Sequence, residues 1–370
     1  MGAYIAKRLL LMIPTLLGMM ILTFAIVQFV PGGPIERIIS KIQGTAVDAT
    51  ARIGGGQGGD VGRGVDPGAF GSNSLAVKYR GAQGLDPEFI KKLEVQFGFD
   101  KPPLERFLLM MKNYLTFNFG DSYFRDKPVL DLIIEKMPVS ISLGLWLLLI
   151  TNFVSIPLGI RKAVKDGTHF DIWTSTVIIV GYAIPGFILA ILLIVLFAGG
   201  SYFSVFPLRG LTSDNFADLS FFGKMMDYAW HLVLPLIAMG IGGFATTTLL
   251  TKNSFLDEIR KQYVITARAK GLSERRVLYG HVFRNAMLLV IAGFPGAFLG
   301  AFFTGSLLIE NIFSLDGLGL LTYTAALNRD YPVFFANVYI AGLVGLFVAL
   351  ISDLIYTFVD PRIDFESRDL

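Results

Sequence analysis

Six long stretches without a charged residue constrain the fold of this chain more than any other feature. They cover residues 9–30, 137–160, 172–208, 229–251, 285–309 and 331–352. A helix needs about 20 apolar residues to cross the hydrocarbon core of a bilayer. Inside that core every backbone polar group must be hydrogen-bonded within the protein. The sequence therefore predicts an all-α membrane protein with six transmembrane helices.

The first stretch has the outline of a signal peptide, because Lys7 and Arg8 precede an apolar run. Its 22 residues exceed the h-region of about 7 to 15 residues that signal peptides carry, and no A-x-A cleavage pattern follows. We therefore expect a retained transmembrane helix within residues 1–34, which ends where Pro31-Gly-Gly-Pro34 cannot continue it.

The distribution of Lys and Arg predicts the orientation of these helices. The N-terminus and the segments 161–171, 252–284 and 353–370 hold 2, 3, 8 and 2 of them, whereas segments 199–228 and 310–330 hold 3 together. Because short cytoplasmic segments are enriched in Lys and Arg, both termini are expected in the cytoplasm. Residues 353–370 are then a cytoplasmic tail, and residues 137–352 form a five-helix transmembrane core that includes the 252–284 loop.

The remaining segment, residues 35–136, is a long loop that the same orientation places on the periplasmic side. Its first half is rich in glycine from about residue 44 to 84, a composition typical of flexible chain, and we expect the stretch 53–64 to be dispensable for folding. Its second half predicts a small helical subdomain. Asp86-Pro87 is a plausible helix start, and apolar side chains recur at three- and four-residue spacing at Phe89, Leu93 and Phe97, then at Leu104, Phe107, Leu108 and Met111.

Several kinds of chemistry have no counterpart in the sequence. The chain lacks a G-x-x-x-x-G-K-[ST] phosphate-binding loop and has no cysteine, and His169, His231 and His281 lie far apart. We therefore predict no catalytic residue, no bound cofactor and no metal site. The six stretches also lack the intramembrane charges that ion-coupled transporters carry, so energy for transport is expected from a partner. A secondary transporter and a membrane-embedded enzyme remain as weaker alternatives.

The 252–284 loop is basic and has a helical pattern. A first helix is predicted to end at Gly271, a residue type favoured in the left-handed conformation after a helix, and Ser273 is expected to cap a second helix with Glu274 in its first turn. The small side chains of Ala267 and Ala269 would then be exposed at a bend where a partner could approach. The alternative is an ordinary solvated cytoplasmic loop.

This loop resembles the EAA loop of ABC importer permeases, in the form found in the dipeptide/oligopeptide/nickel family. Other segments are similar to that family in the same order along the chain: RLLLMIPT at 8–15, GDS at 120–122, PVSISLG at 138–144, GSLLIE at 305–310, GLG at 317–319, NRDYP at 328–332 and DPRI at 360–363. The first position of the loop, usually Glu, is Thr266 here. The glycine-rich insertion is longer than in typical members and most resembles YejB-type permeases, whose systems import oligopeptides and the peptide antibiotic microcin C.

The resemblance implies the type I importer permease fold and a peptide import function. It implies a second, homologous permease, two ATPase subunits that bind ATP and Mg²⁺, and a periplasmic substrate-binding protein, in a bacterial inner membrane. Nickel or another small solute is the alternative cargo. The residues implied to couple this chain to the ATPase, here called the EAA-like loop, are Thr266, Ala267, Arg268, Ala269, Lys270, Gly271, Leu272, Ser273 and Glu274.

Prolines and hydroxyl side chains within the stretches are further candidates. Pro185, Pro235 and Pro295 could be hinges in moving helices, or could lie beside the small residues through which membrane helices ordinarily pack. Thr246, Thr247 and Thr248 could line the transport path or form hydrogen bonds between helices. The residues alone leave both questions open.

Overall fold

The computed structural model describes residues 2–29, 33–42, 87–96, 98–200, 202–303 and 307–359. Within these ranges the chain is helical and forms no β-strand, only one isolated bridge between Asp121 and Pro128. The glycine-rich insertion, including the stretch 53–64, lies outside the described residues, as does the DPRI segment at 360–363. The all-α prediction holds for the part of the chain that the structure describes.

Four described helices are long and apolar enough to cross a membrane: α1 (Gly2–Phe29), α6 (Val129–Val164), α9 (Phe221–Ile259) and α15 (Tyr331–Val359). A fifth candidate is the pair α7 (His169–Ala183) and α8 (Gly186–Phe197), which are bent by 98° relative to each other. The fifth predicted stretch is occupied largely by α12 (Phe283–Phe303). Several apolar side chains on α6 and α7 are exposed, among them Phe153 at 76% and Trp173 at 70%, as expected for a surface that meets lipid.

Two of the predicted stretches belong to much longer helices. Helix α6 begins at Val129 rather than Met137, and α9 begins at Phe221 rather than Ala229 and continues to Ile259. Ser220 caps α9, where its hydroxyl accepts the N–H of Gly223 at 3.2 Å. The predicted stretches were bounded by the first charged residue, whereas these extensions contain charged residues and continue the helix beyond that point.

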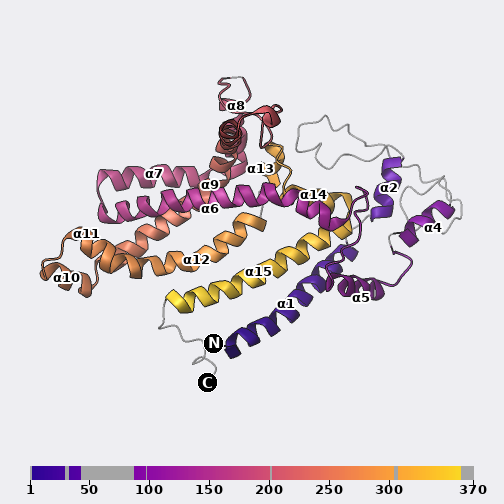
Figure 1. Ribbon diagram of the computed structural model, residues 1–370, viewed down its shortest axis with the longest axis horizontal. Helices are drawn as coiled ribbons and strands as arrows, with labels where there is room; N and C mark the ends of the chain where they lie inside the picture. The colour runs from indigo at the N-terminus through magenta and orange to yellow at the C-terminus, as the bar shows by residue number, and fades with distance from the viewer. Residues whose placement is uncertain are drawn as a thin grey trace, which may run out of the picture. The chain divides into compact units, whose positions relative to one another are not determined.

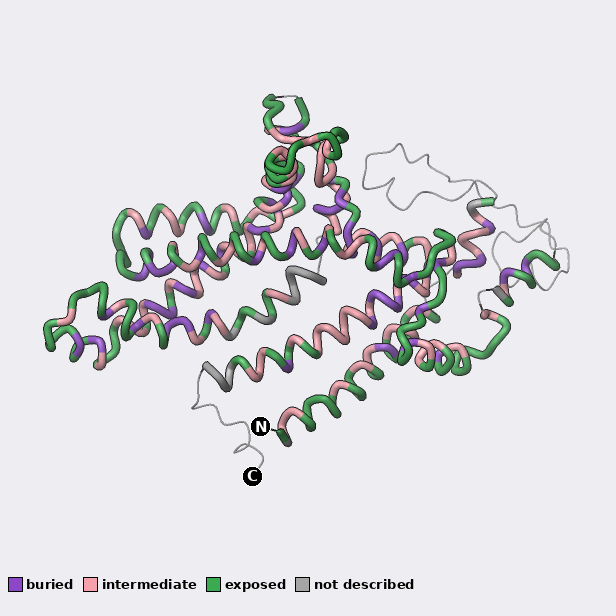
Figure 2. The backbone as a smooth tube through the Cα atoms, viewed as in Figure 1, coloured by how far each residue is buried: buried purple, intermediate pink, exposed green. Residues whose placement is uncertain are grey.

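The chain divides into two compact units. The first combines residues 1–9, 137–320 and 344–370, and it contains α7 to α13 (Leu307–Ile312). One core lies where α8, α9 and α13 meet, and includes Leu143, Ala190, Leu234, Ala238 and Ile309. In Figure 1, α10 (Gln262–Ala269) and α11 (Glu274–Val277) lie together beyond the end of α9, at the start of α12. Figure 2 shows buried positions recurring along α9, the central helix of this unit.

The second unit combines residues 10–136 and 321–343. Helix α2 (Pro34–Ile42) packs on α4 (Pro87–Gln96) through buried Ile35, Ile39, Ile90 and Leu93. Helix α2 begins with Pro34, and the carboxylate of Glu36 accepts the N–H of Gly33 at 3.1 Å, the return half of a capping box. The unit also contains α5 (Pro103–Tyr114) and most of α14 (Leu318–Asn328).

The helical patterning predicted for the second half of the long loop is confirmed, but only some of the apolar residues that form the pattern are buried. Helix α4 starts at Pro87 as expected, yet Phe89 is 37% exposed while Ile90 and Leu93 are buried. On α5, Phe107 is buried whereas Leu104 and Leu108 are exposed. The partner of α4 is α2, and the face that α2 covers could not be read from α4 alone. Phe97 lies outside the described residues.

Candidate functional site

The EAA-like loop is built as a short helix, a tight bend and a second short helix. Helix α10 ends at Ala269, and Gly271 follows in the left-handed conformation with φ +83°. The N–H of Gly271 donates to the carbonyl of Arg268 at 2.9 Å, and the N–H of Leu272 donates to the carbonyl of Ala267 at 3.3 Å. These two bonds are the paired pattern of a Schellman motif. The predicted helix end at Gly271 is confirmed.

An ion pair holds the bend from outside. The guanidinium of Arg268 donates to both carboxylate oxygens of Glu274, at 2.9 and 3.0 Å. This bidentate geometry joins the last turn of α10 to the first residue of α11. Ser273 stands at the N-cap position of α11, but its hydroxyl makes no capping bond, so the ion pair and the Schellman bonds shape the turn.

The inner face of the loop is packed on the ends of the long helices. Val264 and Ala267 of α10 are buried together with Phe255 of α9, Val277 of α11 and Ile160 of α6. Ala267 is 7% exposed, so the prediction that both alanines would be exposed is wrong for this residue. Residues 264 and 267 share one face of a helix, and that face is the core-facing one. The loop is therefore joined to α6, α9 and α12 by one continuous apolar core.

The outer face is free of contacts with the rest of the described chain at its apex. Ile265 is 50% exposed, and Thr266, Ala269, Lys270 and Gly271 are exposed as well. A Cβ added at Gly271 would meet no described atom within 4 Å. The outer face thus presents small, apolar and cationic groups on a bend whose backbone is fixed from within.

A tyrosine connects the three helices that surround the loop. The Tyr263 hydroxyl donates to the Glu258 carboxylate at 2.7 Å and accepts the Asn285 amide N–H at 3.3 Å. Burial raises the pKa of Tyr263 above its usual value, which keeps the hydroxyl protonated and able to donate. The end of α9, the start of α10 and the start of α12 are thereby linked through one side chain.

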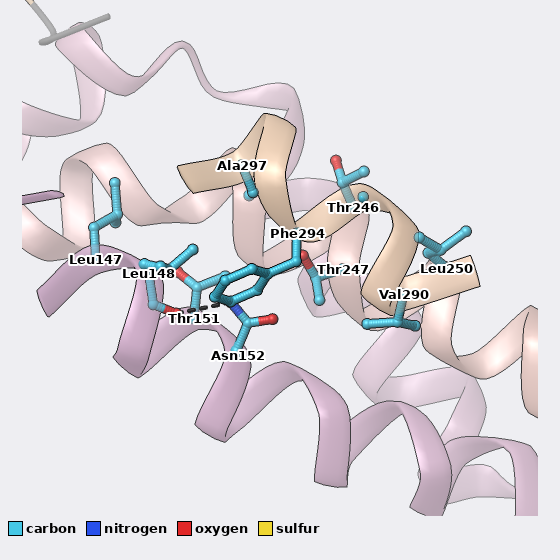
Figure 3. A pocket seen from close by; sticks show the side chains of 12 residues that line it. Leu147, Leu148, Thr151, Asn152, Thr246, Thr247, Leu250, Val290, Phe294 and Ala297 are labelled. Carbon is cyan, nitrogen blue, oxygen red and sulfur yellow. Dashed lines mark hydrogen bonds between the residues drawn. The ribbon is translucent and has the colours of Figure 1, made fainter. Parts of the chain in front are cut away.

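A cavity of about 520 Å³ lies among α6, α9 and α12 (Figure 3). Its polar lining comes from Thr151, Asn152, Thr246 and Thr247, and the remaining lining is apolar, including Phe294. The Asn152 amide donates to the carbonyl of Leu148 at 2.8 Å, and the Thr246 hydroxyl to that of Gly242 at 3.0 Å. No charged side chain lines this cavity among the residues that the structure describes.

The structure separates the three threonines that the sequence grouped. Thr246 and Thr247 line the cavity, whereas Thr248 is fully buried and is not part of its lining. The carbonyl of Thr248 lies against α6 instead, 2.8 Å from where a Cβ on Gly159 would stand. The Thr246 hydroxyl bonds within its own helix, and the buried Thr248 hydroxyl has no hydrogen-bond partner among the described residues. The described contacts of these two residues thus include no hydrogen bond between helices, and a role of Thr246 and Thr247 in lining the transport path stays a prediction.

The three candidate hinge prolines occupy different settings. Pro185 stands between α7 and α8, at the N-cap of α8, where the 98° bend occurs. Pro235 is buried inside the continuous helix α9, and Pro295 lies within α12. Of these three prolines, only Pro185 coincides with a break in the described backbone. The stretch 172–208, which the sequence prediction counted as one span, therefore contains a sharply bent pair of helices. Proline lacks an N–H and fixes its own φ, which disfavours helix through this position.

Three of the segments that carry the family resemblance meet at one buried cluster in the first unit. The Ser140 hydroxyl accepts the N–H of Leu318 at 2.8 Å, and the Glu310 carboxylate accepts the N–H of Leu320 at 2.8 Å. Gly317 lies so close that an added Cβ would stand 2.8 Å from the Ser140 oxygen and 2.9 Å from a Glu310 oxygen. The Ser140 and Glu310 side chains can therefore occupy these positions only because residue 317 is a glycine.

Two more of these segments meet in the second unit. The Ser122 hydroxyl donates to one oxygen of the Asp330 carboxylate at 2.5 Å, and the Tyr123 N–H donates to the other at 3.0 Å. Burial raises the pKa of Asp330, while these donors favour the ionised form. The GDS and NRDYP segments are thus the two sides of one buried contact.

Sequence reasoning missed a group of charged residues next to the loop. Lys162 is fully buried, two residues beyond the end of the second predicted stretch, and pairs with Asp171 at 3.0 Å. Lys252 pairs with the other oxygen of Asp171 at 2.7 Å and with Asp166 at 3.0 Å. In the sequence these residues look like ordinary cytoplasmic charges, because only the helix extensions bring them together.

The chain matches known permeases over its whole length. The family model of the binding-protein-dependent transport system inner membrane component covers residues 155–365. The chain is 65% identical to the peptidoglycan transport system permease protein YejB of Agrobacterium fabrum, over 100% of both chains. It is 57% identical to the inner membrane ABC transporter permease protein YejB of Escherichia coli O157:H7, also over 100% of both.

A more distant relative is the oligopeptide transport system permease protein AppB of Bacillus subtilis, 31% identical over 99% of this chain and 100% of that one. The family match includes Thr246 and Thr247 of the cavity, the EAA-like loop, and Glu310 with Gly317. The protein accordingly belongs to the family of binding-protein-dependent inner membrane transport components, and it is an ABC transporter permease rather than an enzyme.

Proposed function

We propose that this chain is one permease subunit of an importer that carries oligopeptides across a bacterial inner membrane, driven by ATP hydrolysis on partner subunits. Its relatives are named as permeases of peptidoglycan, oligopeptide and dipeptide transport systems. The cavity lining supports a peptide cargo, because amide and hydroxyl groups can hydrogen-bond a peptide backbone whatever the charge of its side chains. Peptide antibiotics of the microcin C type fall within this class.

The observation that carries the proposal is the form of the EAA-like loop. It presents an exposed outer face on a bend that Schellman bonds and the Arg268–Glu274 pair hold in shape. Its inner face is buried in the same core as the ends of α6, α9 and α12. A surface that binds an ATPase differently in its two nucleotide states would shift the helices between two populations, and the cavity lies among those same three helices.

The complete transporter would contain a second homologous permease, two ATPase subunits that bind ATP and Mg²⁺, and a periplasmic binding protein. Six transmembrane helices would place both termini in the cytoplasm and residues 35–136 in the periplasm. The split of Lys and Arg between the two sets of short segments, 15 against 3, supports this orientation. Residues 353–370 would be the cytoplasmic tail, although helix α15 continues to Val359.

Reconstitution tests the proposal directly. The chain, co-expressed with its permease partner and ATPase subunits, is placed in proteoliposomes with the binding protein outside and ATP inside. Uptake of a labelled oligopeptide that needs both ATP and the binding protein is the expected result. Uptake driven by an ion gradient without ATP would contradict the proposal, and ATP-dependent uptake of Ni²⁺ but of no peptide would redirect it to the nickel alternative.

A further inference from the structure

A network of charged residues joins the inner ends of α6, α7 and α9. The ammonium group of Lys162 donates to the Thr174 hydroxyl at 2.7 Å, the Ser175 hydroxyl at 2.8 Å and the Asp171 carbonyl at 3.0 Å, besides its ion pair with the Asp171 carboxylate. Lys252 of α9 then pairs with the second Asp171 oxygen. Every donor of the buried Lys162 ammonium thus has an acceptor on α7.

Such an arrangement is costly to build. Taking a charged group out of water costs several kcal/mol, and apolar residues of similar volume often stabilise a protein more than a buried ion pair does. The need for tight packing does not explain why buried charges are present here. A role in fixing one arrangement of the helices would explain it. The question is which helices the network holds, and against what movement.

The bent pair α7–α8 contacts α9 at several places, and a Cβ on Gly181, for example, would stand 3.0 Å from the Ile241 side chain. Two other places lie on either side of the bend. Towards the outer end, α8 packs closely on α9, because a Cβ on Gly186 would stand 2.8 Å from the carbonyl of Ala238 and Ala190 is fully buried. At the inner end, the Lys252–Asp171 pair joins α9 to the first turn of α7. The 98° bend at Pro185 lies between these two places. The ion pair is therefore the inner brace of a bent element.

The Lys252–Asp171 ion pair, here called the inner brace, lies near the end of α9 that leads into the EAA-like loop. Lys252 precedes the end of α9 by two turns, and Asp166, its second partner, lies 3.5 Å from Arg260, the residue that closes α9 before α10 begins. A push on the loop moves this end of α9 first. With the brace intact, α7 has to follow.

We propose that Lys252 and Asp171 are positioning residues that make the α7–α8 pair move together with α9 when the EAA-like loop is displaced. The inference rests on the proposed function, because it assumes that an ATPase acts on that loop. Without the brace, ATP hydrolysis would still displace α9, but less of the displacement would reach α7 and the bend at Pro185. The consequence is a loss of coupling between hydrolysis and transport rather than a loss of either folding or ATPase binding.

Lys252→Met is the most informative variant. It removes the α9–α7 link while leaving the buried Lys162–Asp171 pair in place. Arg260→Gln is the matched control, because it removes a cation at the end of α9. The Arg260 side chain is 70% exposed, and its contact with Asp166 is longer than that of Lys252. Lys252→Arg keeps the charge and serves as the conservative variant. Lys252→Gln is a second disrupting variant, should the methionine substitution lower the amount of inserted protein.

The experiment measures peptide taken up per ATP hydrolysed by the complete transporter in proteoliposomes. We expect Lys252→Met and Lys252→Gln to lower this ratio about 2- to 30-fold, the range over which substitutions in coupling networks act, with normal insertion and ATPase retention. Lys252→Arg should recover most of the ratio, and Arg260→Gln should leave it unchanged. A wild-type ratio in the two disrupting variants would overturn the inference alone. Absence of ATP-dependent uptake by the wild-type transporter would overturn the proposed function as well.

Discussion

Gly317 is one of the glycines at which the structure leaves no room for a side chain. An added Cβ would stand 2.8 Å from the Ser140 hydroxyl and 2.9 Å from the Glu310 carboxylate, and both partners are buried and hydrogen-bonded to the backbone of α14. Neither oxygen can move away without breaking its bond to Leu318 or Leu320. A close approach of this kind accepts glycine alone.

We therefore predict that Gly317→Ala destabilises the protein by about 1–3 kcal/mol, the usual cost of overpacking a well-packed core. Thermal unfolding of the detergent-solubilised chain measures it. Gly242→Ala is the matched control, because that glycine lies in α9 with no atom within 4 Å of an added Cβ, and it should be neutral or slightly stabilising. Equal melting temperatures for Gly317→Ala and wild type would show that the cluster can relax.

The Arg268–Glu274 pair joins helices α10 and α11 across a bend. Its side chains are 41% and 74% exposed, and exposed ion pairs contribute about 0.2–1 kcal/mol after screening by solvent. Its effect on overall stability should accordingly be small. Its effect on the shape of the bend should be larger, because the bend has few other bonds on its outer side.

We predict that Arg268→Glu and Glu274→Arg each weaken retention of the ATPase, and that the double substitution restores it. The restored variant regains the ion pair with its charges exchanged, so the bend can close again. Co-purification of the ATPase with each variant measures this. If the double variant is no better than the single ones, at least one of the two side chains contacts the ATPase directly instead of shaping the bend.

Helices of this chain could be predicted where the apolar pattern and the residues that typically start or end a helix indicate the same bounds. The helix start at Pro87 and the left-handed end at Gly271 follow from local rules and are confirmed. Four described helices, or five with the bent pair α7–α8, are long and apolar enough to span a membrane, and the count of six stays a prediction. Pro185 was predicted as a candidate hinge, but the angle of the bend could not be predicted, because hydropathy does not record the direction of a helix. The EAA-like loop was located by its resemblance, and that it couples to an ATPase stays a prediction.

The remaining features depend on contacts between distant residues. The buried face of α4 is chosen by α2, and the inward position of Ala267 is chosen by the core at the ends of α6 and α9. The Lys162–Asp171–Lys252 network needs three helix extensions to meet. No pattern within one segment contains this information, so sequence reasoning could not have found it.

At the scale of the whole molecule, orientation in the membrane is open to direct test. The chain has no cysteine, so single thiols can be introduced without background at Lys165, in the turn after α6, and at Asp218, in the short helix Phe216–Asp218. We predict that an impermeant thiol reagent labels Asp218→Cys in intact spheroplasts and labels Lys165→Cys only after lysis. Labelling of position 165 alone would show that the orientation is inverted.

ATP binding is expected on the partner subunits of the transporter and not on this chain. The sequence contains no phosphate-binding loop of the G-x-x-x-x-G-K-[ST] type. We predict that the purified chain without partners binds no ATP, as measured with a labelled ATP analogue. Saturable binding at micromolar nucleotide would place part of the nucleotide chemistry on this subunit.

The central claim is that the EAA-like loop transmits force from an ATPase, and Gly271 tests it most directly. A Cβ added here meets no described atom of the chain itself within 4 Å, and the left-handed backbone costs a substituted residue about 1–2 kcal/mol. Gly271→Asn, which tolerates this conformation and stays short, controls for the backbone effect. A further loss with a long side chain, at normal insertion, is the effect that a clash with a partner surface would produce.

The decisive measurement is peptide-stimulated ATP hydrolysis and peptide uptake by the reconstituted transporter carrying Gly271→Arg. The account predicts normal insertion, weaker retention of the ATPase, and a joint collapse of hydrolysis and uptake, with Gly271→Asn close to wild type. Full uptake by Gly271→Arg with the ATPase still bound would contradict it, and the loop would then be an ordinary solvated segment of the cytoplasmic surface.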